Sequence, residues 1–146
     1  MLKGISPYLS PELLKILAEM GHGDEILLAD AHFPGHTLGQ RVVRADGLSV
    51  SQLLDAILPL FELESADDAL AMMQRDDNAA HDEVEADFLA VVRRHAVRTR
   101  PAARVARQAF YERAKAAYCV VMTGEVRPYG NLILKKGVTP EWPSGR

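Results

Sequence analysis

Hydrophobic positions along the chain fall into segments of two kinds, which predict alternating helices and strands. Apolar residues three and four positions apart indicate amphipathic helices, and this spacing is found over residues 10–20, 49–61, 81–96 and 108–117. Nearly continuous apolar runs indicate strands covered on both faces, and such runs occupy residues 25–31, 41–45, 69–74, 118–125 and 132–137. The run at 69–74 also suits a helix fragment, and we interpret it as a strand. The alternation predicts a single α/β domain, with helices layered around a mainly parallel sheet and with loops over 32–39 and 98–107.

The first helix and the strand that follows it have well-marked boundaries. Ser10 is a suitable N-cap and Pro11 suits the first helical position. Gly21 suits the left-handed residue just past the helix, so His22 lies in a tight, glycine-flanked connection. Asp30 lies at the carboxyl end of the strand, where ligands of α/β sheets tend to bind.

Composition and charge argue against several classes of protein. The length of 146 residues suits one domain whose core needs no disulfide or metal, and Cys119, the single cysteine, is expected to be a buried hydrophobe. The net charge of −3 argues against binding to nucleic acid or to an anionic membrane. The N-terminus lacks the apolar region of a signal peptide, and no apolar run approaches the roughly 20 residues of a membrane span. We therefore expect a cytoplasmic protein without membrane or nucleic-acid partners.

Metal binding is one chemistry that the polar residues could support. Side chains able to ligate a metal gather in one segment: His22, Asp24, Asp30, His32 and His36. Their spacing matches none of the common zinc or calcium motifs, and Pro34 prevents His32 and His36 from pairing on a helix. We therefore expect no metal. The alternative is a metal-dependent hydrolase built on His22, Asp24 and His32, which would lose its activity with a chelator.

Proton transfer fits the sequence better, because the usual motifs of nucleophilic catalysis and nucleotide binding are absent from it. A histidine can give or take a proton near neutral pH. His22 precedes the strand that Asp30 follows, so the two meet only if the chain folds back or if they face each other across a subunit interface. The alternative for His22 is a turn residue that caps the C-terminus of the first helix.

Two further places in the sequence could bind a ligand, and the first of them suits an uncharged, hydroxyl-rich one. The segment 127–131 contains Tyr129 and Asn131, whose side chains are neutral donors and acceptors; a proline-initiated turn is the alternative. Arg107 stands at a predicted helix start, where it either binds a ligand or is a solvated charge. These patterns alone predict an α/β domain with polar loops and no named substrate.

Four long stretches resemble the L-fucose mutarotase branch of the RbsD/FucU sugar-mutarotase family: LSPELLKILAEMGHGDEILLADAHFPGH, RADGLSVSQLLDAILPLFEL, AFYERAKAAYCVVMTGE and YGNLILKKGVTP. The resemblance is close over residues 1–75 and 104–140, whereas over 76–102 only the helix pattern persists. It implies a single compact RbsD/FucU-like domain over residues 1–146. It further implies a mutarotase that interconverts the α and β anomers of L-fucose or a related pyranose without cofactor or metal, and a homodecameric ring with sites near the subunit contacts.

The same resemblance assigns roles to individual residues. His22, in MGHGDE, matches the family's catalytic histidine, and Asp30, in ADAHFP, matches its sugar-binding aspartate. Further sugar-binding positions of the family match Arg107, Tyr129, Gly130 and Asn131. Two alternatives stay open, namely a D-ribose pyranase of the related branch and a non-catalytic sugar-binding or regulatory protein.

Two features depart from the family pattern. Gln108 and Tyr118 stand where other aromatic residues are expected. The tail 141–146 has no assigned place in the fold. It is either a loose end or a segment whose Trp142 packs on a neighbouring subunit.

Overall fold

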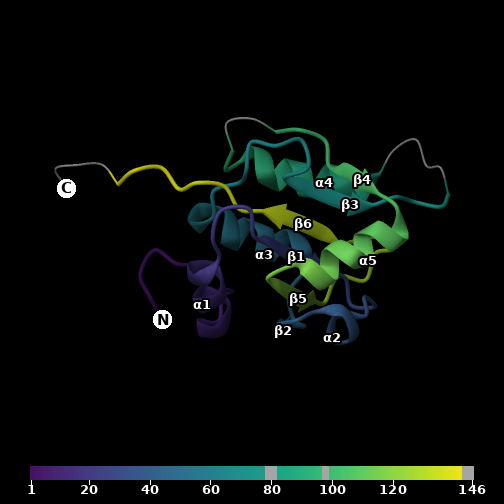
Figure 1. Ribbon diagram of the computed structural model, residues 1–146. Helices are drawn as coiled ribbons and strands as arrows, with labels where there is room; N and C mark the ends of the chain where they lie inside the picture. Colours follow the sequence, from purple (N-terminus) through teal and green to yellow (C-terminus); the bar gives the residue numbers. More distant parts are fainter. Residues whose placement is uncertain (78–81, 97–98, 143–146) are drawn as a thin grey trace.

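A six-stranded mixed sheet forms the centre of the fold (Figure 1). The computed structural model describes residues 1–77, 82–96 and 99–142. In spatial order the sheet runs β2-β5-β1-β6-β3-β4. The strands have these bounds: β1 (Glu25–Ala29), β2 (Val42–Ala45), β3 (Leu70–Met73), β4 (Ala103–Val105), β5 (Cys119–Thr123) and β6 (Leu132–Lys135). All strands except β4 lie within the runs predicted from the sequence, and the interpretation of 69–74 as a strand is confirmed.

Five strands run in one direction, and β6 runs in the other. β5 pairs in parallel with both β1 and β2, and β3 pairs in parallel with β4. β6 lies between β1 and β3 and is antiparallel to both. The carboxyl ends of β1 to β5 and the start of β6 therefore share one edge, which we call the carboxyl edge; the opposite ends form the amino edge. The prediction of a mainly parallel sheet is confirmed.

Helices cover both faces of the sheet and give the fold three layers (Figure 1). The larger core lies under α1 (Pro11–Glu19), α3 (Val50–Ile57) and α4 (Glu83–Arg93). The smaller core lies under α2 (Gly35–Leu38) and α5 (Arg107–Ala116). Along β1, Ile26 and Leu28 enter the larger core, whereas Leu27 and Ala29 enter the smaller one. The continuous apolar run in this part of the sequence therefore reflects burial on both faces.

Side-chain caps begin α1, α3 and α4 close to the predicted starts of these helices. Ser10 Oγ accepts a hydrogen bond from the Leu13 N–H at 3.1 Å. Ser49 and Gln52 form a reciprocal capping box at the start of α3, and Asp82 caps α4 through two backbone N–H groups. A cap of this type typically stabilises a helix by about 1 kcal/mol.

Two elements occur where the sequence predicts loops. Residues 35–38 form the one-turn helix α2, and residues 103–105 form β4. The sequence does not predict β4, because this strand has only three residues and exposes the charged Arg104. It is also the outermost strand of the sheet, so it lacks the continuous apolar run of a central strand. The predicted helix over 49–61 tightens after α3 into the 3₁₀ turn η1 (Leu58–Leu60), which contains Pro59.

Burial gives Cys119 the structural role expected of it. Its side chain is fully buried in β5, and this desolvation raises the pKa of the thiol to about 11. A thiol reacts as its thiolate, so Cys119 acts as a core side chain at neutral pH. No helix in the described part of the chain is long and apolar enough to cross a membrane.

The end of the chain leaves the sheet after β6 as an extended segment (Figure 1). Trp142 is 83% exposed there, and the predictions for residues 143–146 and for His81 lie outside the described residues. Packing of Trp142 on a neighbouring subunit stays a hypothesis.

Candidate active site

The loop that carries His22 lies at the amino edge, between α1 and β1. Gly23 has a positive φ of 84°, so the left-handed residue is Gly23 rather than the expected Gly21. The Gly23 N–H donates to the Lys136 carbonyl at 2.8 Å, which ties the loop to the end of β6. Lys136 Nζ donates to two carbonyls at the end of α1, at 3.0 and 2.7 Å. The helix-capping role considered for His22 therefore belongs to Lys136.

The imidazole of His22 pairs with the carboxylate of Glu64. His22 Nε2 contacts Glu64 Oε2, with 59% of the histidine side chain exposed and 22% of the glutamate side chain. The pKa of Glu64 is held below its usual value, first by the Ser65 N–H and then by His22. Sequence reasoning missed Glu64, because it stands in a short polar linker before β3 with no spacing that relates it to His22.

At the carboxyl edge, Asp30 and Asn131 form a buried reciprocal pair. The backbone N–H of Asp30 donates to Asn131 Oδ1 at 2.7 Å, and Asn131 Nδ2 donates to Asp30 Oδ2 at 2.9 Å. The His32 N–H donates to the other oxygen of the Asp30 carboxylate, Oδ1, at 2.9 Å. Only 7% of Asp30 and 4% of Asn131 is exposed. Such satisfied hydrogen bonds fix both side chains in single orientations.

Tyr129 and Arg107 are linked at the same edge through an aspartate. Tyr129 Oη donates to Asp76 Oδ2 at 3.1 Å, and Arg107 Nη2 donates to the same oxygen at 3.0 Å. The guanidinium of Arg75 lies over the Tyr129 ring, 5.1 Å from its centroid. Tyr129 has a φ of 59°, a conformation that costs a non-glycine residue of order 1–3 kcal/mol and is often found at functional sites. Asp76 gave no signal in the sequence, because it lies outside every element and motif.

Gly130 lets the same loop pack against the ion pair of the buried Glu125 with the partly exposed Arg127. Glu125 is 5% exposed, and its Oε1 and Oε2 accept from Arg127 Nε and Nη2 at 3.0 and 3.2 Å. A Cβ on Gly130 would lie 2.7 Å from Glu125 Cγ and 2.9 Å from the Arg127 carbonyl. No larger side chain fits there without displacing the loop that presents Tyr129 and Asn131.

We expect Gly130→Ala to destabilise the fold by about 1–3 kcal/mol, because the methyl group overpacks the loop. The free energy of unfolding in urea measures the loss. Gly47→Ala is the matched control, since a Cβ on Gly47 would meet nothing within 4 Å. Equal losses in the two variants would contradict the close packing.

The proposed catalytic and binding residues lie at opposite edges of the sheet. His22 comes before β1 and Asp30 directly after it. The five residues of β1 span about 16 Å. The connection does not fold back, so one chain does not bring His22 to Asp30. Asp30, Arg107, Tyr129, Gly130 and Asn131 share the carboxyl edge.

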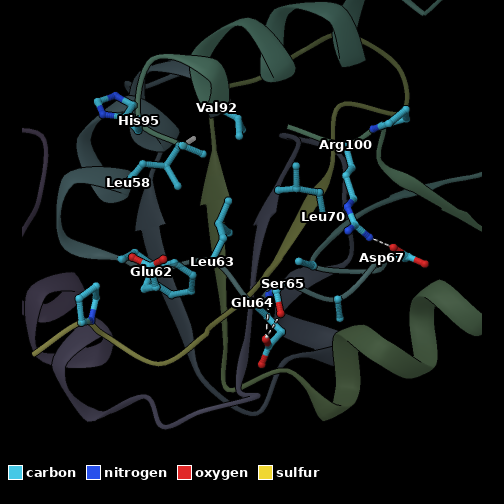
Figure 2. A pocket seen from close by; sticks show the side chains of 16 residues that line it. Leu58, Glu62, Leu63, Glu64, Ser65, Asp67, Leu70, Val92, His95 and Arg100 are labelled. Atoms are coloured by element: carbon cyan, nitrogen blue, oxygen red, sulfur yellow. Dashed lines mark hydrogen bonds and ion pairs between the residues drawn. The ribbon is translucent and has the colours of Figure 1, made fainter. Parts of the chain in front are cut away.

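A cavity of about 520 Å³ lies elsewhere, beside the segment between η1 and β3 (Figure 2). Apolar side chains such as Leu58, Leu70 and Val92 line it, and Glu64 and Ser65 stand on its wall. None of the residues assigned to sugar binding lines this cavity. Across the described residues, no group of three or more His, Cys, Asp or Glu side chains is arranged to hold a metal ion.

Comparison with known sequences identifies the relatives of this chain. Residues 3–139 match the model of the RbsD / FucU transport protein family. The L-fucose mutarotase of Glaesserella parasuis serovar 5 (strain SH0165) is 57% identical over 96% of this chain and 97% of its own length. The L-fucose mutarotase of Histophilus somni (strain 2336) is 56% identical over 96% and 99%.

Solved structures give the same relationship. The fucose mutarotase from Streptococcus pneumoniae in complex with L-fucose superposes with a TM-score of 0.89 and is 40% identical, covering 95% of this chain and all of its own. Bacillus subtilis RbsD complexed with D-ribose superposes with a TM-score of 0.68 and is 25% identical, covering 95% and 99%. The matches share the fold and extend over nearly the full length of the chain, and the chain belongs to the RbsD/FucU family.

Proposed function

We propose that this chain is a sugar mutarotase that interconverts the α and β anomers of L-fucose. The observation that carries the proposal is the hydrogen-bonding cluster at the carboxyl edge, which combines fixed polar side chains with a strained tyrosine. Curated relatives that match nearly the full length at 55–57% identity are named L-fucose mutarotase, which supports the same reaction here.

The chemistry of the reaction suits a histidine. Opening the sugar ring requires a proton on the ring oxygen and removal of a proton from the anomeric hydroxyl; closing the ring on the other face reverses both transfers. One imidazole can act as acid and base in turn. His22 is assigned this role. Asp30, Arg107 and the loop of Tyr129 and Asn131 hold the sugar hydroxyls by hydrogen bonds.

Each site then requires two chains. His22 and the carboxyl-edge cluster cannot meet within one chain, because β1 separates them. His22 of one subunit faces the cluster of a neighbouring subunit in the proposal, within a homo-oligomer that we expect to be a decamer in the cytoplasm. The exposure of the His22 side chain, 59% in the single chain, supports a position at such a contact.

The ribose alternative is not favoured. The ribose-bound relative superposes less closely than the fucose-bound one, with TM-scores of 0.68 and 0.89, and its identity is 25% instead of 40%. A purely binding protein is not favoured either, because a binding site needs no group able to exchange protons.

Anomer exchange tests the proposed function directly. Saturation transfer between the two anomeric protons is measured by NMR for L-fucose, D-ribose and D-galactose, with and without the protein. We expect the fastest exchange for L-fucose, with no effect of EDTA. Acceleration of no sugar would contradict the proposal and favour a binding role; inhibition by EDTA would favour the metal alternative.

A further inference from the structure

We propose that Glu64 is a positioning residue that holds the tautomer of His22 and leaves Nδ1 as the nitrogen that exchanges protons with the sugar. The inference rests on the proposed function. It concerns a residue to which the family resemblance assigns no role.

The contact between the two side chains determines which nitrogen is available. Glu64 Oε2 contacts His22 Nε2, and an ionised carboxylate only accepts hydrogen bonds. The neutral imidazole must therefore carry its proton on Nε2, which leaves the lone pair on Nδ1. The lowered pKa of Glu64 keeps this carboxylate ionised across the neutral range. A carboxylate that orients a histidine and sets its tautomer in this way is a recurrent arrangement in acid/base catalysis.

The carboxylate of Glu64 is itself held in place. Its Oε1 accepts from the Ser65 N–H at 2.7 Å and from Ser65 Oγ at 3.2 Å (Figure 2). Since both of these donors bind Oε1, Oε2 is left to bind His22. A surface glutamate tied to its neighbour in this way loses little further freedom when it binds the imidazole.

The backbone also fixes the two loops relative to each other. The Glu64 N–H donates to the Lys135 carbonyl at 3.0 Å, and the Gly23 N–H donates to the Lys136 carbonyl at 2.8 Å. The segments of Glu64 and His22 are thus bonded to consecutive residues at the end of β6. Because the backbone holds both segments at the end of β6, the fold itself brings Glu64 and His22 together at the amino edge.

Glu64→Gln tests the role, because the amide keeps the size of the side chain but can donate to Nε2 and removes the charge. We expect kcat for L-fucose exchange to fall about 10- to 100-fold, the range for a lost hydrogen bond to a charged group, with KM little changed. ¹⁵N NMR of the histidines, recorded well above the usual histidine pKa of about 6.5, should show His22 leaving the Nε2–H tautomer. Glu62→Gln is the matched control, because it removes an exposed carboxylate two residues away.

The outcomes separate this inference from the proposed function. A wild-type chain that accelerates no sugar contradicts the function and, with it, the role of Glu64. An active wild type together with unchanged kcat and tautomer in Glu64→Gln overturns the role of Glu64 alone. A loss of kcat without any change of tautomer also overturns it, because a purely structural defect would produce that pattern.

Discussion

Replacing His22 by glutamine is expected to lower kcat for L-fucose anomer exchange by about 10²–10⁴-fold, the usual contribution of acid/base catalysis. Glutamine has a similar size and still forms hydrogen bonds, but it cannot exchange a proton near neutral pH. Sugar binding should change much less, because the residues proposed to hold the sugar hydroxyls are unchanged in this variant.

NMR saturation transfer gives kcat, and titration of the sugar gives its affinity. His36→Gln is the control, since His36 is an exposed histidine on α2. Full turnover in His22→Gln would show that another group transfers the proton, and the site would have to be assigned again.

Mixed oligomers of two inactive variants are expected to regain activity. Asp30→Ala removes the acceptor of Asn131 Nδ2 and should abolish sugar binding, whereas His22→Gln lacks the acid/base group. If each site takes His22 from one chain and Asp30 from its neighbour, random equal mixing restores about a quarter of the sites. Each variant alone should remain inactive.

The two variants are co-expressed, or unfolded and refolded together, and the exchange rate is measured per chain. The doubly substituted chain, mixed equally with wild type, is the control. It should also give about a quarter of the wild-type rate for two-chain sites, but about half if each chain held a complete site. Recovery of no activity from the two single variants would contradict the shared site.

Much of the fold could be predicted because its signals are local. The apolar run of β1 is buried on both faces, and Ser10 and Ser49 cap their helices through their own neighbours in sequence. β4 gave no such signal. Its place in the sheet comes from pairing with β3, which lies about 30 residues earlier in the chain.

The residues of the candidate site also differ in whether the local sequence reveals them. A histidine between glycines and an aspartate at a strand end are visible in one segment of sequence. The segment 127–131 and Arg107 were also candidates from the residues alone, and the resemblance gave them a sugar-binding role. The sequence could not reveal the roles of Glu64 and Asp76, because each depends on a partner far away in the chain. Glu64 contacts His22, 42 residues away, and Asp76 contacts Tyr129, 53 residues away. Such contacts follow from the order of strands in the sheet, and no local pattern encodes that order.

The central antiparallel strand has a consequence for how the protein is made. β6 follows the other five described strands in the sequence, yet it lies between β1 and β3, so before β6 is synthesised those strands can pair only as two separate groups. Asn131 directly precedes this strand and fixes Asp30 at one edge, while Lys135 and Lys136 anchor the loops of Glu64 and His22 at the other. The complete sheet therefore forms only after β6 has been synthesised. A chain that stops short of β6 lacks both the joined sheet and the residues that anchor the two halves of the proposed site, so we expect such a fragment to be inactive.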